Sequence, residues 1–270
     1  MPAFEPITRK VLVINFRPAA IPATWSQADD LIPQYIEKMK TASGNQLVYQ
    51  VVKKMDAPNY PVLLGERQYD DVSWAQARTD DAQAYRDRNN SYQMVDYQRL
   101  IQEYNFLQAI QNQAVDEVWL FGGPYFGFYE SCMIGRGAFW CNGPAIERDC
   151  TRFVIMGFNY ERAAREMVHD YGHRAERILA KHFRSETFLD KLYRLEPTPA
   201  PRNAFEQFLL DHGTVHRKPG GEEYKQDEFA WLSAMPPEWW PPTIDPNQVQ
   251  TRPGWYEFLA NLVSRFWPRR

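Results

Sequence analysis

The sequence lacks an excess of basic charge, a long apolar run and a cysteine framework. Its 31 Lys and Arg stand against 34 Asp and Glu, and no stretch approaches the roughly 20 apolar residues that a membrane-spanning helix needs. We therefore expect neither a nucleic-acid partner nor a membrane partner. The odd count of three cysteines, Cys132, Cys141 and Cys150, has no CxxC spacing, so a cysteine zinc site is not expected. Any two of them could pair if the protein is secreted.

Several targeting and nucleotide-binding motifs are also absent. The first ten residues have no apolar core typical of a signal peptide, so we expect a cytoplasmic protein, or a secreted one if a leader has been removed. Neither GxGxxG nor GxxxxGK[ST] occurs, which argues against a nucleotide site. No GxSxG surrounds Ser131, which argues against a serine hydrolase.

What is present is a chain of 270 residues with 15% aromatic residues, long enough to bury a large core. Four short apolar runs are typical of buried strands: 10–16, 47–52, 117–121 and 152–158. Helical patterns separate them, at 26–41 and 94–113, whereas 56–90 lacks periodicity and is predicted to be a long loop. This alternation predicts an α/β fold: a mostly parallel sheet with flanking helices, a Rossmann-like three-layer arrangement.

The composition changes at Pro197. The last 74 residues hold 11 of the 20 prolines and 5 of the 9 tryptophans. We therefore predict an α/β body over 1–196 and an irregular Pro- and Trp-rich C-terminal extension over 197–270 that wraps the body. Trp239, Trp240 and Trp255 could stack on a glycan or peptide, but adjacent tryptophans in such a tail more often pin it to the domain.

One predicted helix, 160–182, carries a metal-binding pattern. Asn159 is a plausible N-cap for it. Spacings of three, four and three place Glu166, His169, His173 and Glu176 along one stripe of this helix. Two histidines four residues apart can hold a single zinc, as in the HExxH signature of metallohydrolases.

The sequence does not decide which residue would act as the general base of such a site. Asp170 stands where the HExxH signature has Glu, and its side chain is one methylene shorter. The base is therefore Asp170, or else Glu166 or Glu176, with Asp170 supporting a ligand.

A catalytic zinc usually takes a third protein ligand. The candidates are His212 and His216, in a second HxxxH pair that lies in a Gly- and Pro-containing segment of the extension. Such a loop can deliver an imidazole to a helix from elsewhere in the fold.

Four segments carry a resemblance: 118–131, 137–143, 156–162 and 169–176. Together they resemble a family of largely uncharacterised microbial proteins with the signature GFNYER…HxxGHRxE…GxVH, over about residues 10 to 225. Gly213-Thr-Val-His216 is similar to the family's Gly-x-x-His-x-Pro-Pro segment, although Lys218 replaces its first Pro. The resemblance implies a shared site with His216 as third ligand, and it names no reaction.

The loop over 122–137 follows a predicted strand and is rich in glycine and aromatic residues. It could form a substrate wall, or it could be a well-packed structural loop. In the first case Tyr125 and Tyr129 would stack on a ligand, and Glu130 or Arg136 would bind a polar group. Asn159, at the end of the next strand, would join them.

These patterns favour a metal-dependent hydrolase, with zinc on His169, His173 and His216, that cleaves an amide or peptide bond through a metal-bound water. The alternative is a non-catalytic glycan- or peptide-binding protein with structural histidines. A third hypothesis is a metal-free Rossmann-like enzyme that works from the strand ends near Asn15, Gly123 and Asn159. The expected partner is a small-molecule, peptide or glycan substrate.

Overall fold

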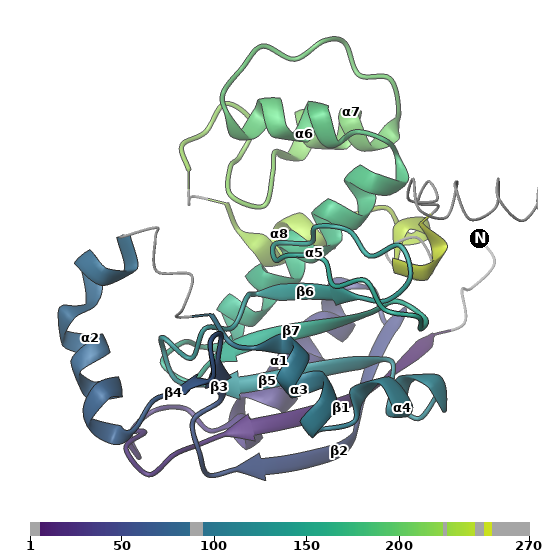
Figure 1. Cartoon of the computed structure of the whole chain (residues 1–270). Coiled ribbons are helices and arrows are strands. Elements are labelled where there is room, and N and C mark those ends of the chain that lie inside the picture. The colour runs from purple at the N-terminus through teal and green to yellow at the C-terminus, as the bar shows by residue number, and fades with distance from the viewer. Residues whose placement is uncertain (1–5, 87–93, 224–225, 241–245, 250–270) are drawn as a thin grey trace, which may run out of the picture.

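A five-stranded sheet with helices on both faces forms the centre of the protein (Figure 1). The computed structural model describes residues 6–86, 94–223, 226–240 and 246–249. The strand order is β2-β1-β5-β7-β6, and only β6 runs antiparallel to its neighbour. The strands are β1 (Ile7–Phe16), β2 (Leu47–Ala57), β5 (Glu117–Gly122), β6 (Ser131–Ile134) and β7 (Phe153–Asn159). The predicted α/β architecture is confirmed.

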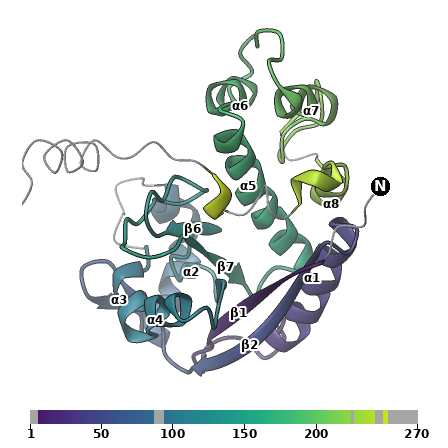
Figure 2. The same cartoon turned by 90° about the vertical axis from the view of Figure 1, so that its right-hand side faces the viewer.

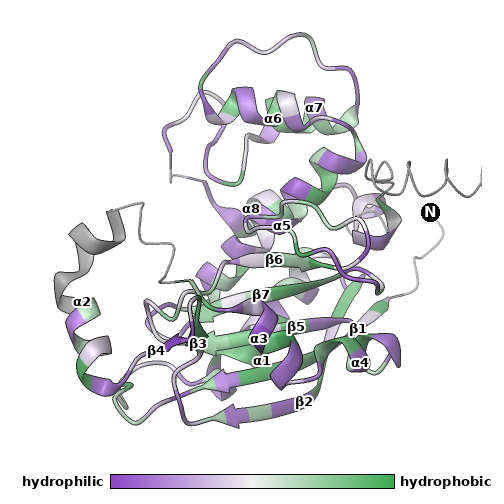
Figure 3. Ribbon diagram, viewed as in Figure 1, coloured by the Kyte–Doolittle hydropathy of each residue, from purple (hydrophilic) through white to green (hydrophobic). Residues whose placement is uncertain are grey.

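The apolar runs become strands because both faces of the sheet are covered. All six residues of β5 are buried, as are the last six of β1 and the first four of β7. Helices α1 (Ala28–Ala42) and α5 (Ala164–His182) lie on one side of the sheet, and α3 (Tyr97–Glu103) and α4 (Phe106–Gln111) on the other (Figure 2). Hydropathy follows this layering, with green strands at the centre of Figure 3.

The prediction of a loop over 56–90 is wrong as far as Arg86, and its last four residues lie outside the described part of the chain. A two-stranded hairpin, β3 (Val62–Leu63) and β4 (Arg67–Gln68), leads into helix α2 (Asp71–Arg86). The start of α2 does have a sequence signal: the Asp70 carboxylate accepts the Ser73 N–H at 2.7 Å. The helix lacks a clear apolar stripe, which explains why periodicity does not reveal it.

Two other elements differ from expectation. The helix predicted over 94–113 is two short helices, because Asn105 between them adopts a left-handed conformation with φ 52°. Strand β6 lies inside the segment predicted as a loop, and its four residues are buried against β7. A four-residue run within a glycine-rich segment is too short to stand out.

The described part of the C-terminal extension packs on the body through Trp239 and Trp240. Helix α6 (Glu186–Tyr193) precedes the extension. The extension itself contains α7 (Ala204–His212), α8 (Glu228–Ser233) and two short 3-10 turns, Pro237–Trp239 and Pro246–Gln248. Trp239 packs against Phe183, with ring centroids 5.4 Å apart, and Trp240 stacks on Tyr171 at 6.2 Å. Both indoles are buried, so they pin the chain and do not form a binding surface. Trp255 lies outside the described residues.

Across the described part of the chain, no helix is both long enough and apolar enough to traverse a membrane.

Candidate metal centre

Helix α5 starts later than predicted. Its first residue is Ala164, and the Glu166 carboxylate accepts the Ala163 N–H at 3.2 Å. The prediction that Asn159 caps this helix is therefore wrong. Asn159 ends β7, and its side-chain oxygen accepts the Glu161 N–H at 2.9 Å, which shapes the turn between strand and helix.

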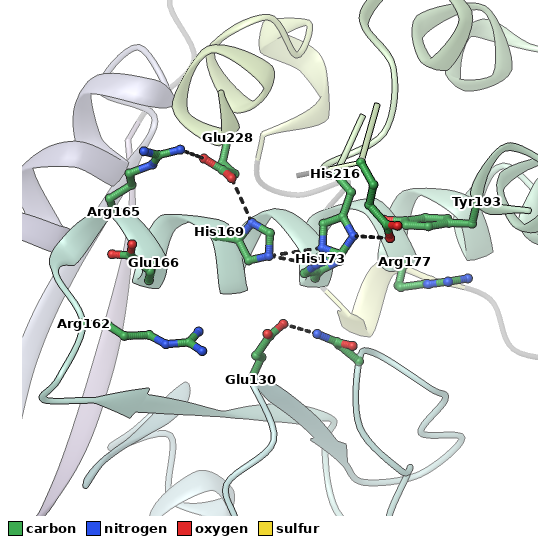
Figure 4. A pocket seen from close by; sticks show the side chains of 12 residues that line it. Glu130, Arg162, Arg165, Glu166, His169, His173, Arg177, Tyr193, His216 and Glu228 are labelled. Carbon is green, nitrogen blue, oxygen red and sulfur yellow. Dashed lines mark hydrogen bonds and ion pairs between the residues drawn. The ribbon is translucent and has the colours of Figure 1, made fainter. Parts of the chain in front are cut away.

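Three imidazoles converge above the middle of α5 (Figure 4). The Nε2 atoms of His169 and His173, one helical turn apart, are separated by 3.1 Å. The Nε2 atom of His216 lies 2.7 Å from that of His173 and 3.3 Å from that of His169. These three residues lie close enough to hold a metal ion. His212 is not part of this cluster, since it ends α7 and packs its ring against Phe208.

Local packing delivers His216 to the helix. Gly172 lies between the two helical histidines, and a Cβ there would stand 3.1 Å from the Val215 side chain, so the missing side chain permits close approach. Gly213 allows the chain to leave α7, with φ 80°. Its carbonyl accepts the Trp231 indole N–H at 3.0 Å.

Glu176 holds the loop that carries His216 through two hydrogen bonds. One carboxylate oxygen accepts the Val215 N–H at 2.9 Å, and the other accepts the Tyr193 hydroxyl at 2.6 Å. The side chain is fully buried, and burial raises its pKa to about 7. Glu176 therefore positions the residue beside His216 and does not face the cavity, so its predicted role as general base is not supported.

Carboxylates lie beside the Nδ1 atoms of two of the imidazoles, on the side away from the cluster. His169 Nδ1 lies 3.1 Å from a carboxylate oxygen of Glu228. A carboxylate only accepts, so the His169 proton resides on Nδ1 and the Nε2 lone pair faces the cluster. His216 Nδ1 lies 3.7 Å from a carboxylate oxygen of Glu223.

The electrostatics of the cluster favour the neutral forms of His173 and His216. Burial, together with the neighbouring charges of His169 and His216, lowers the pKa of His173 to about 2. Burial, followed by the charge of His169, also lowers the pKa of His216. Neutral imidazole is the form that binds metals.

The donor set suits zinc. Imidazole nitrogens about 2.0–2.1 Å from a tetrahedral zinc lie about 3.3 Å apart. The observed separations of 2.7, 3.1 and 3.3 Å approach this triangle. When each ring carries its proton on Nδ1, the three Nε2 lone pairs face one another and a cation between them would be bound by all three, so the residues present fit a bound metal.

The histidines open into a cavity of about 660 Å³. Its lining is almost entirely ionisable or polar: Glu130, Asn142, Arg162, Arg165, Glu166, His169, His173, Arg177, Tyr193, His216, Glu223 and Glu228. Of the carboxylates proposed as general base, only Glu166 lines this cavity.

Asp170 is buried and does not line the cavity, although it occupies the position of the HExxH glutamate. It is only 5% exposed. Burial and then the charge of Glu130 raise its pKa well above the usual value. The structure therefore does not support Asp170 as the base.

The predicted substrate wall contributes one residue, Glu130. Its carboxylate accepts the Asn142 amide, and burial raises its pKa against the lowering effect of the His169 charge. Arg136 instead pairs with Asp149, outside the cavity, as a surface ion pair.

The other proposed wall residues also lie away from the cavity lining. Tyr129 stacks on Tyr97, with ring centroids 6.1 Å apart. Tyr125 occupies a turn with φ 66°. Asn159 shapes the turn described above.

The hypothesis of a metal-free enzyme places its ligand at the strand ends near Asn15 and Gly123, but the residues there already pack against or bond to other side chains. Asn15 donates to Asp56 at 2.7 Å and accepts the Tyr160 hydroxyl. A Cβ at Gly123 would stand 2.7 Å from the Ile21 side chain and 3.0 Å from Trp74.

Several cavity residues escaped the sequence analysis. They are Glu228, Glu223, Arg162, Arg165, Arg177, Tyr193 and Asn142. Arg165 and Arg177 do carry a signal, because they occupy helical positions near the histidine stripe. Glu223 and Glu228 come from the extension, and nothing in their local sequence connects them to α5.

Comparisons of this chain with protein-family models, curated proteins and solved structures returned no match.

Proposed function

We propose that this protein is a zinc-dependent hydrolase of amide or peptide bonds. The observation that carries the proposal is the convergence of three imidazole Nε2 atoms, 2.7–3.3 Å apart, at one wall of a polar cavity. Three protein ligands with open space beside them are typical of catalytic zinc, whereas structural zinc takes four.

A zinc ion on these residues would supply a Lewis acid that polarises a carbonyl and makes water nucleophilic near neutral pH. Hydrolysis then adds the hydroxyl of water to the carbonyl carbon, breaks the carbon–nitrogen bond and leaves the amine protonated. The protein must supply a group that takes a proton from water and returns it to the amine.

Glu130 and Glu166 are the two candidates for that group. Both line the cavity, and Glu130 faces the histidines from the opposite wall (Figure 4). The Asn142 amide holds one Glu130 carboxylate oxygen and fixes the side chain. Burial raises the Glu130 pKa, which brings the carboxyl group closer to the working range of a general base. We favour Glu130.

The test combines metal content and activity. We expect about one equivalent of zinc in protein purified without chelators, and chelator-sensitive hydrolysis of a panel of peptide and acyl-amide substrates. His169→Ala should remove both properties. His212→Ala is the matched control, because it removes an imidazole from the other HxxxH pair and should leave both intact.

The same variants discriminate the alternative of a non-catalytic glycan- or peptide-binding protein. In that case His169→Ala would leave ligand binding unchanged, and the folded wild-type protein would take up no zinc. Folded protein that cannot be loaded with zinc would overturn the hydrolase proposal.

A further inference from the structure

The cations that line the cavity differ in their partners. Arg165 lies 3.4 Å from a Glu228 carboxylate oxygen, and Arg177 lies 2.9 Å from Asp190. Arg162 lines the same cavity, yet among the described residues no carboxylate lies within the 4.0 Å of an ion pair with its guanidinium.

The turn that joins β7 to α5 fixes the backbone of Arg162. Its N–H donates to the Asn159 carbonyl at 3.1 Å. From this turn the side chain extends below Glu166 toward the side of the cavity that carries Glu130 (Figure 4). The positive charge of Arg162 lowers the pKa of Glu130, so its field reaches the part of the cavity that faces the histidines.

We infer that Arg162 binds a carboxylate of the substrate, so that the enzyme cleaves amides whose amine or acyl part carries a free carboxyl group. The C-terminal residue of a peptide and an N-acyl amino acid belong to this class. The inference rests on the proposed hydrolase function and specifies its substrate.

The charge of the cavity favours a monoanion. Four glutamates and three arginines line it, a formal charge of −1 that a divalent metal ion would change to +1, which suits one negative charge better than the two of a phosphate dianion. A single guanidinium offers a planar pair of donors that matches one carboxylate. The reaction itself is unchanged: water is consumed, one amide bond breaks, and a carboxylic acid and an amine are released.

The proposed role of Arg162, which we call the carboxylate anchor, can be tested by measuring ligand binding without measuring hydrolysis. The probes are succinic, glutaric and adipic monohydroxamates, each paired with the neutral compound in which a primary amide replaces the carboxylate. The hydroxamate addresses the metal in every probe, and the three chain lengths sample the span to Arg162. We expect at least one carboxylate probe to bind the zinc-loaded protein about tenfold or more tightly than its neutral partner in calorimetry.

Variants assign the preference to one residue. Arg162→Met should remove the preference for the carboxylate while the neutral hydroxamates bind as before, and Arg162→Lys should keep part of it. Arg177→Met is the matched control, since it removes a cavity cation that already has a partner and should keep the preference. The zinc content of each variant verifies its fold.

The outcomes separate the two proposals. If neutral hydroxamates bind in a zinc-dependent manner and no carboxylate probe binds more tightly, the metal site stands and the anchor is wrong. A preference that survives Arg162→Met also overturns the anchor. If no hydroxamate binds the zinc-loaded protein, the hydrolase proposal fails and the anchor fails with it.

Discussion

The strand ends of the sheet and the cavity above α5 are both places where an α/β protein could bind a ligand, and they differ in how their polar groups are used. At the strand ends, Asn15 already bonds both Asp56 and Tyr160. In the cavity, three imidazole Nε2 atoms face one another, and Arg162 lines the same cavity with no ion-pair partner among the described residues. The cavity is therefore the better candidate for a ligand site, because polar groups that already have hydrogen-bond partners gain little from binding a ligand.

The largest effect should come from removing a central ligand. His173→Ala leaves two imidazoles, and we expect the affinity for zinc to fall by about a thousandfold or more, so that stoichiometric metal is lost on purification. Elemental analysis measures this directly.

A strand-end variant is the control for that loss. Asn15→Ala deprives Tyr160 and Asp56 of their partner and should lower the free energy of unfolding by about 1–3 kcal/mol, with zinc content unchanged. Loss of zinc in Asn15→Ala, with His173→Ala still metallated, would reverse the comparison.

The next largest effect should be a dependence of the free energy of unfolding on pH. Burial raises the pKa of Glu176 from the usual 4.5 to about 7. A raised pKa in the folded state means that this group stabilises the fold fully below pH 4.5 and loses that contribution as the pH rises through about 7. Metal-free protein should therefore lose up to roughly 3 kcal/mol of stability across this window.

Denaturant unfolding at a series of pH values in the presence of a chelator measures that loss. Glu176→Gln cannot titrate, so the variant should flatten this part of the profile. An identical profile in wild type and variant would show that another group is responsible.

A smaller effect is expected from the carboxylate that orients a ligand. Glu228→Gln keeps the shape of the side chain but loses the charge that fixes the His169 proton on Nδ1. We expect zinc affinity to fall about 10- to 100-fold, measured by competition with a chelator of known affinity. Unchanged affinity would mean that the extension does not tune the site through this contact.

The smallest effect should come from Arg136. Its pairing with Asp149 is exposed, with 65% and 87% of the two side chains accessible, and it lies outside the cavity lining. Arg136→Met should change the free energy of unfolding by less than about 0.5 kcal/mol and leave zinc affinity and hydrolysis unaltered. A marked loss of hydrolysis would return Arg136 to the substrate wall.

The parts of the fold that were predictable are those whose signal is local. β1, β5 and β7 read as continuous apolar runs because they are buried on both faces. α2 has no apolar stripe, and β6 is short, so neither produces a periodic signal.

The same distinction applies to the site. The positions of His169 and His173 follow from helical geometry, which places residues four apart on one face. Asp170 matches the HExxH position in the sequence, but the packing around α5 buries its side chain, which the local sequence does not indicate. Glu228 could not be found locally, because 59 residues separate it from the histidine that it contacts.

By itself, the sequence determined the central strands, the helical pair of histidines and the pinning of the extension by its tryptophans. Each depends on contacts within a few residues or on the burial of large apolar side chains. Only the tertiary structure decided which distant groups meet: His216 at the helix, Glu228 behind His169, and Arg162 across from Glu130 with no ion-pair partner in the described part of the chain. The physical reason is that long-range pairing depends on how whole elements pack, and no local pattern encodes it.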